Sequence, residues 1–228
     1  MFLTRFTMNA ARRGTKNLVA SPQRMHAAVL SSYHPSSDPG RVLWRLDRNS
    51  THDLQLYLVG AAKPDLTHLV EQAGWPTTES WQTADYVPFL RRLEAGQRWR
   101  FRLTANPVRA VRRPDNPAQR SRGRVSPEVT VMQQAEWLRN RSEDWGFRLP
   151  ADANGFPGVS VTSRAQDAFS RRDLETRDLR DSRVTITRVQ FDGLLEVSDP
   201  ERLREALAAG MGRAKAYGCG LMTLASAR

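Results

Sequence analysis

The stretch Phe2-Leu3-Thr4-Arg5-Phe6-Thr7-Met8-Asn9 alternates in side-chain character, with Phe2, Thr4, Phe6 and Met8 on one face. Side chains of a β-strand alternate in the same way, so these residues predict a strand. A similar stretch, Trp99-Arg100-Phe101-Arg102-Leu103-Thr104-Ala105-Asn106, occurs near residue 98 and also runs from a strand pattern through asparagine into a basic segment. The repeat predicts a chain built from two halves of similar length and fold.

In the first half, predicted strands and helices follow the order βαββα and then a further strand. A helix is expected from Pro22 to about residue 32, with Ser21 as its N-cap, and a second one from Pro64 to Gly74. The basic segment before Ser21 is expected to be a connection without regular structure. The strands are expected at 2–8, 42–46, 54–58 and, less regularly patterned, 81–89.

The second half repeats this order with one additional strand. A loop rich in proline, serine and asparagine is expected at 114–126, and a charged hairpin or loop at 164–183. The Asp192-Gly193 pair is expected to be a turn between two strands. The helices are expected at 127–142 and from Pro200, and the strands at 98–106, 158–162, 183–191, 194–198 and 220–225. We therefore predict an α+β protein with two tandem ferredoxin-like domains, residues 1–94 and 95–228.

The charge of the chain favours a polyanionic partner. Thirty-five lysine and arginine residues face 24 acidic ones, which gives a formal net charge of +11. Such an excess is typical of nucleic-acid binding and less so of membrane binding. Cys219 is the single cysteine, so an internal disulfide or a cysteine-based zinc site is excluded. With no long apolar run and no signal peptide expected, we predict a cytoplasmic protein without a membrane span.

The segment Gly210-Met211-Gly212-Arg213-Ala214-Lys215-Ala216-Tyr217-Gly218-Cys219-Gly220 combines four glycines with two cations. Glycine permits close approach of a ligand to the backbone, and several N–H groups beside positive charge suit a phosphodiester. The segment is neither a Walker A loop nor a dinucleotide fingerprint. A helix C-cap followed by a tight turn explains the glycines equally well, and both interpretations stay open at this point.

His26 is the histidine whose position favours a chemical role. It lies in the second turn of a predicted helix, after a basic segment, where an imidazole could move a proton beside a bound phosphate. The alternative is an ordinary histidine flanking the apolar face of Met25, Ala28 and Val29. None of the four histidines has metal-ligand spacing, so we expect no metal site and no cofactor.

Several motifs together resemble the CasE family, the guide-RNA-processing endoribonucleases of type I-E CRISPR systems. The most specific is the glycine-rich segment continued through Leu221, and Met25-His26 matches a second one. The others are Phe101-Arg102-Leu103-x-Ala105-Asn106-Pro107, Glu136-Trp137-Leu138 to Gly146-Phe147-Arg148-Leu149, and Phe191-x-Gly193-x-Leu195-x-Val197-x-Asp199-Pro200. The resemblance runs from the first strand to the last.

This resemblance implies a double ferredoxin-like enzyme that binds the hairpin of CRISPR repeat RNA and cuts precursor crRNA at the 3′ base. The implied reaction needs no metal: the ribose 2′-hydroxyl attacks the phosphate, leaving a 2′,3′-cyclic phosphate and a 5′-hydroxyl. The product stays bound, and the enzyme, a monomer when isolated, joins the other Cascade subunits. A protein that binds or assembles hairpin RNA without cutting it is the alternative, and a general nucleic-acid-binding protein is a third.

The family histidine corresponds to His26, as general acid or base. Relatives carry a tyrosine three residues earlier, where this chain has Gln23, which can donate a hydrogen bond but no phenolic proton. Arg13 and Arg24 are candidates to stabilise the phosphate, and Arg171 and Arg172 match basic residues that meet the RNA stem. The full set of predicted RNA contacts is Gln23, Arg13, Arg24, Arg102, Arg109, Arg112, Arg113, Arg171, Arg172, Arg213 and Lys215, with Gly210, Gly212, Gly218 and Gly220 in the glycine-rich loop.

Overall fold

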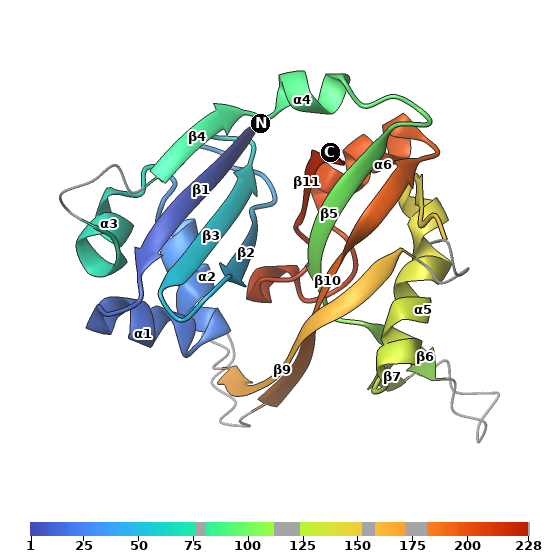
Figure 1. The fold of residues 1–228 in the computed structure, drawn as a ribbon. Helices are drawn as coiled ribbons and strands as arrows, with labels where there is room; N and C mark the ends of the chain where they lie inside the picture. Colours follow the sequence, from blue (N-terminus) through green and yellow to red (C-terminus); the bar gives the residue numbers. More distant parts are fainter. Residues whose placement is uncertain (76–80, 112–123, 152–157, 172–181, 228) are drawn as a thin grey trace, which may run out of the picture.

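The computed structural model describes residues 1–75, 81–111, 124–151, 158–171 and 182–227, and shows two antiparallel sheets side by side (Figure 1). The first sheet has the strand order β2-β3-β1-β4. Its strands are β1 (Phe2–Asn9), β2 (Leu43–Arg48), β3 (Asp53–Gly60) and β4 (Trp81–Asp85). The second and third strands, both predicted, pair antiparallel, with Leu46 opposite Leu56.

The helices of the first half are α1 (Arg13–Val19), α2 (Pro22–Leu30), α3 (Thr67–Ala73) and α4 (Val87–Arg91). The N-cap of α2 is as predicted, since Ser21 Oγ accepts the Arg24 N–H at 3.3 Å. The expectation of an irregular basic connection before Ser21 is wrong. That segment forms α1 because Leu18 is buried and Thr15 Oγ1 donates to the Ala73 carbonyl at 3.1 Å.

The last strand of this half is shorter than the predicted range 81–89. β4 ends at Asp85, whose Oδ1 accepts the Val87 N–H at 3.0 Å, and α4 begins directly afterwards. Figure 1 shows α4 leading from the first sheet to the second. Its Leu90 and the following Leu93 are buried in the core of the second half. This segment therefore ties the halves together as well as joining them.

The second main sheet has the order β11-β5-β10-β8, with β9 also paired to β10. The strand orders of the two sheets correspond, as expected for two ferredoxin-like units. Its strands are β5 (Arg98–Ala105), β8 (Phe147–Arg148), β9 (Val159–Arg171), β10 (Ser182–Val197) and β11 (Met222–Ser226), and a small separate sheet contains β6 (Val108–Val111) and β7 (Arg124–Pro127). The helices are α5 (Val131–Ser142) and α6 (Pro200–Ala209), with single 3₁₀ turns η1 (Glu143–Trp145) and η2 (Lys215–Tyr217).

The predicted turn at Asp192-Gly193 is wrong, because β10 runs through it as one continuous strand. Gly193 pairs with Phe101 on one side and Val159 on the other. A Cβ at this glycine would lie 2.2 Å from the Gly158 carbonyl oxygen, so glycine serves the close approach of β9 and not a reversal of the chain. The hairpin formed by β9 and β10 also replaces the expected short strand at 158–162, and its residues 172–181 lie outside the described structure.

Arg45 on β2 is the centre of the junction between the two sheets. Its side chain is 1% exposed and forms a bidentate ion pair with Asp47, with Nε–Oδ1 and Nη2–Oδ2 distances of 2.6 and 2.9 Å. Its remaining donors reach the second half: the Arg102 carbonyl at 2.7 Å, the Leu221 carbonyl at 3.1 Å and Thr223 Oγ1 at 2.8 Å. All five guanidinium donors are thus used, and the buried charge is compensated.

Arg102 on β5 completes this junction from the opposite side. Its Nε lies 2.6 Å from Asp192 Oδ1, and its Nη1 donates to Asn49 Oδ1 at 3.0 Å and lies 3.4 Å from Asp47 Oδ2. The pKa of Asp192 is held below its usual value by hydrogen bonds from Arg102, Thr162 and Gln190, which outweigh the opposing effect of burial. The two arginines and two aspartates therefore form one network across the junction.

No helix in the described part of the chain is long and apolar enough to span a membrane.

Replacing Arg45 by methionine should destabilise the protein by about 3–5 kcal/mol, because Asp47 stays buried after its main partner is lost. Urea unfolding followed by circular dichroism measures the difference. Arg48→Met, on the same strand but exposed, is the control and should change stability by less than about 0.5 kcal/mol. A loss below about 1 kcal/mol for Arg45→Met would contradict the role assigned to this residue.

Candidate functional site

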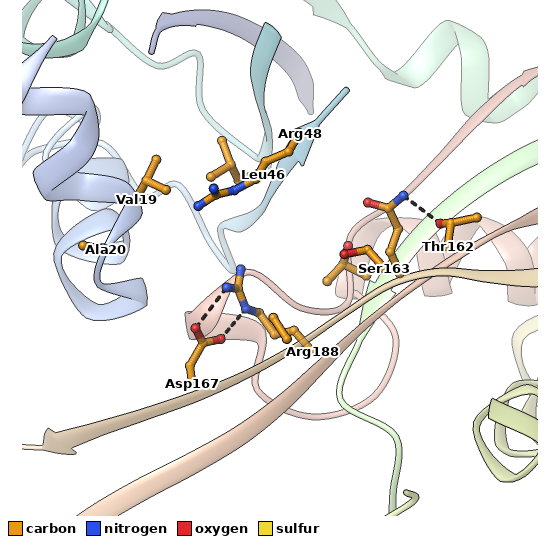
Figure 2. Close-up of a pocket in the computed structure, with 11 residues that line it drawn as sticks. Val19, Ala20, Leu46, Arg48, Thr162, Ser163, Asp167 and Arg188 are labelled. Carbon is orange, nitrogen blue, oxygen red and sulfur yellow. Dashed lines mark hydrogen bonds and ion pairs between the residues drawn. The ribbon is translucent and has the colours of Figure 1, made fainter. Parts of the chain in front are cut away.

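A cleft of about 630 Å³ lies between the two halves. One wall is formed by β2 and the end of α1, and the other by the β9–β10 hairpin. Figure 2 shows Arg48 across from the Arg188–Asp167 pair. Its lining is Val19, Ala20, Leu46 and Arg48 from the first half, and Thr104, Thr162, Ser163, Ala165, Asp167, Arg188 and Gln190 from the second. The cleft therefore exists only because the halves are held in this relation.

The cleft walls are polar and carry basic side chains. Arg188 Nη2 donates to Asp167 Oδ1 at 3.1 Å, and Gln190 Nε2 donates to Thr162 Oγ1 at 2.9 Å. The Arg48 side chain is exposed and forms no hydrogen bond or ion pair with another described residue. An unpaired guanidinium in a polar cleft is suited to a phosphate, which Arg binds through its planar fork.

The glycine-rich loop 210–220 lies beside this cleft and contacts the first half. The Gly220 N–H donates to the carbonyl of Thr104, a cleft residue, at 2.7 Å, and η2 within the loop contacts both α2 and β2. In Figure 1 this red segment extends from the second half toward α2. The helix that carries His26 and the glycine-rich loop are thus packed together, although they come from opposite ends of the chain.

The backbone of the loop explains its glycines. All four have positive φ, and Gly218, at +81°, also lies against the first half: a Cβ there would be 2.6 Å from the Trp44 ring. Gly210 is the C-cap of α6, and Lys215 Nζ donates to the Ala209 carbonyl at 2.7 Å. The C-cap interpretation is therefore confirmed, and the loop additionally fits the surface of β2. Its role in holding RNA stays a prediction.

His26 is partly exposed, while Met25 and Val29 beside it are buried. Its Nδ1 is buried without a hydrogen-bond partner among the described residues. Burial lowers the pKa of the imidazole below its usual value of 6.5, so the neutral form predominates at pH 7. A neutral, partly exposed imidazole can accept a proton. No cluster of three or more potential metal ligands is found among the residues that the structure describes.

Comparison with known proteins identifies the family of this chain. A family model described as "CRISPR associated protein" matches residues 1–226. A relative from Thermus thermophilus named "CRISPR-associated endoribonuclease Cse3" is 33% identical over 99% of this chain and 100% of its own length. This chain belongs to the CRISPR-associated Cse3/CasE family. The resemblance predicted from the sequence motifs is thereby confirmed.

Two further relatives agree with this assignment. A structure of Cse3 endoribonuclease bound to 19 nt RNA has a TM-score of 0.78 and 30% identity, over 99% of this chain and all of that one. The Escherichia coli "CRISPR system Cascade subunit CasE" is 27% identical over 80% of this chain and 88% of its own length. The tandem ferredoxin-like fold is therefore shared with Cse3.

The predicted RNA contacts of this Cse3/CasE family member fall into three groups. Gln23, Arg13 and Arg213 are exposed, and Arg24, also exposed, donates to Asn17 Oδ1; these four lie on α1, α2 or the glycine-rich loop. Three others have intramolecular partners: Arg102 in the junction network, Lys215 on the α6 C-terminus, and Arg109, which lies 4.0 Å from Glu128. Arg112, Arg113, Arg172 and the side chain of Arg171 lie outside the described residues.

Sequence reasoning missed three arginines of this Cse3/CasE site. Arg48 and Arg188 line the cleft, and Arg41 is exposed near Lys215, where burial and the charge of Arg41 together lower the pKa of the lysine. Arg41 and Arg48 flank the predicted strand at 42–46, and Arg188 lies inside a predicted strand. To find these arginines from the sequence, one would have to know which face of each strand is turned toward the cleft. That orientation depends on how the two sheets pack, which local sequence does not give.

The contact between Gly218 and Trp44 predicts that alanine substitution costs more stability at Gly218 than at Gly96, which has a similar backbone conformation. Gly96 has φ +82°, and a Cβ added there would meet nothing within 4 Å, so Gly96→Ala should cost only the left-handed backbone penalty of about 1–2 kcal/mol. Gly218→Ala should cost about 1–3 kcal/mol more, because the new methyl group overlaps the Trp44 ring. Urea unfolding of both variants measures this difference, and equal losses would show that the loop does not pack tightly on β2.

Proposed function

We propose that this chain is a metal-independent endoribonuclease that binds the stem-loop of CRISPR repeat RNA, cuts precursor crRNA at the 3′ base of the hairpin and stays bound as a Cascade subunit in the cytoplasm. The observation that carries this proposal is His26, a partly exposed imidazole on a helix packed against the glycine-rich loop beside a basic cleft. The endoribonuclease relative and the RNA-bound Cse3 structure support it.

The reaction is an internal transesterification. The ribose 2′-oxygen attacks the adjacent phosphorus and loses its proton, while the bond to the 5′-oxygen breaks and that oxygen gains a proton. The products are a 2′,3′-cyclic phosphate and a 5′-hydroxyl. Because the lowered pKa of His26 favours the neutral ring at pH 7, His26 is suited to take the 2′-hydroxyl proton. Gln23 can hold a phosphate oxygen by a hydrogen bond but has no proton to transfer.

The basic side chains supply binding and charge stabilisation. Arg13, Arg24 and Arg213 are exposed on the elements around His26, and we assign them to phosphates near the cut. Arg48 and Arg188 in the cleft are assigned to the strand that leads into the site. An A-form stem presents phosphates and a deep, narrow major groove, so shape and charge are the expected basis of recognition, with Arg171 and Arg172 directed to the stem. Residues 1–94 and 95–228 are the proposed domains.

Replacing His26 by alanine should lower the single-turnover cleavage rate of a repeat hairpin by about 10²–10⁴-fold while leaving the Kd for that RNA nearly unchanged. The cleavage rate is measured on gels, and the Kd by fluorescence anisotropy at fixed salt. His34→Ala, an exposed histidine outside the site, is the matched control and should cleave normally.

One modified substrate and one added reagent separate this mechanism from its alternatives. A 2′-deoxy sugar 5′ of the cut should abolish cleavage, and EDTA should have no effect. If wild-type protein binds the hairpin tightly but never cuts it, the non-cleaving alternative is correct. Loss of activity in EDTA would exclude the metal-independent mechanism.

A further inference from the structure

An exposed aliphatic surface lies at the start of α5, away from the groups used by the proposed reaction. Large hydrophobic side chains are exposed at few described positions, and four of them fall within eight residues. We call these four, Val125, Val129, Val131 and Met132, the α5 patch. Met132 is 79% and Val129 65% exposed. Exposed apolar side chains concentrated in one short stretch of the chain are typical of interaction surfaces.

Hydrogen bonds fix the backbone under the patch. Thr130 and Gln133 form a capping box, in which Thr130 Oγ1 accepts the Gln133 N–H at 3.2 Å and Gln133 Oε1 accepts the Thr130 N–H at 3.1 Å. The fully buried Gln134 donates to the Glu128 carbonyl at 2.9 Å. A surface already fixed in this way loses little conformational entropy when a partner binds.

The patch also borders a hollow. A cavity of about 270 Å³ is lined by Pro127, Val129, Gln134 and Arg164, together with neighbouring residues of β9 and β10. Ala165 on β9 lines both this hollow and the interdomain cleft. A partner seated on the patch would therefore lie next to RNA bound in the cleft.

The chemistry of the patch favours protein over RNA. Valine and methionine neither pair with phosphates nor offer the aromatic faces on which bases stack. Three cations lie close to the patch and are engaged within the protein. Arg109 lies 4.0 Å from Glu128, Arg139 lies 3.0 Å from Glu136, and Arg164 donates to the Val129 carbonyl at 2.5 Å. Around His26, by contrast, Arg13 and Arg213 have no carboxylate partner among the described residues.

We propose that the α5 patch is the docking surface for a protein subunit of the Cascade complex, which covers it with apolar side chains and inserts one of them into the adjoining hollow. The proposal rests on the proposed function, because it assumes that this chain, like the Cascade subunit CasE of E. coli, assembles with other proteins. It adds which surface of this chain makes that contact.

The test is assembly with Cascade subunits from the same organism, using the variant Val129→Glu/Met132→Glu. Both side chains point outward, and two charges on an apolar interface should weaken association by about tenfold or more. Association is measured by biolayer interferometry, with the nuclease bound to an already processed hairpin RNA. Because this RNA needs no cutting, a failure of the proposed cleavage activity would not affect the result.

Asn140→Glu is the matched control, since it adds charge at an exposed position two turns further along α5, and it should assemble normally. Cleavage rate, RNA affinity and thermal stability of the double variant should stay within about twofold or about 2 °C of wild type. Unchanged assembly would overturn the proposal, as would wild-type protein that does not join the complex. An equal loss of RNA affinity would assign the patch to RNA, and a wild-type dimer that the variant abolishes would assign it to a second copy.

Discussion

The buried guanidinium of Arg45 is the interaction on which the remaining structure depends. It is held by Asp47 on its own strand and donates to two backbone carbonyls and one hydroxyl of the second half. A buried arginine is stable only when its charge and its N–H donors are satisfied. Any other packing of the two sheets would leave the Arg45 guanidinium buried without these partners. Because Leu221 directly follows the glycine-rich loop, the same contact also fixes the end of that loop.

The candidate site follows from this junction. With the loop fixed, its Gly218 packs on Trp44 of β2, and η2 reaches α2, which carries His26. One wall of the cleft comes from the α1–α2 connection and β2, and the other from β9 and β10. The site is therefore composite: the imidazole comes from the first half, and the loop and most of the polar lining come from the second. This explains why a single ferredoxin-like unit would carry neither the cleft nor the neighbourhood of His26.

Strands and helix starts that depend on local residue pattern could be predicted from the sequence. The alternation of Phe2–Asn9 and its repeat at 99–106 predicted both first strands, and Ser21 and Pro200 predicted helix starts that the structure confirms. Predictions failed where tertiary contacts decide. α1 depends on burial of Leu18 against the sheet, and Gly193 serves a close approach between strands where a turn was expected. The ion pairs of Arg102 to Asp47 and Asp192 also join residues far apart in sequence, so local pattern could not reveal them, and its contact with RNA stays a prediction.

We expect the RNA strand to pass through the interdomain cleft with the bond to be cut beside His26. The most direct measurement is a structure of this protein with a repeat hairpin carrying a single 2′-deoxy sugar at the cut, which binds but cannot react. The scissile phosphate should lie within hydrogen-bond distance of the His26 ring, and Arg48 or Arg188 should contact a neighbouring phosphate. A phosphate held elsewhere, with the cleft empty and His26 facing solvent or protein alone, would contradict it.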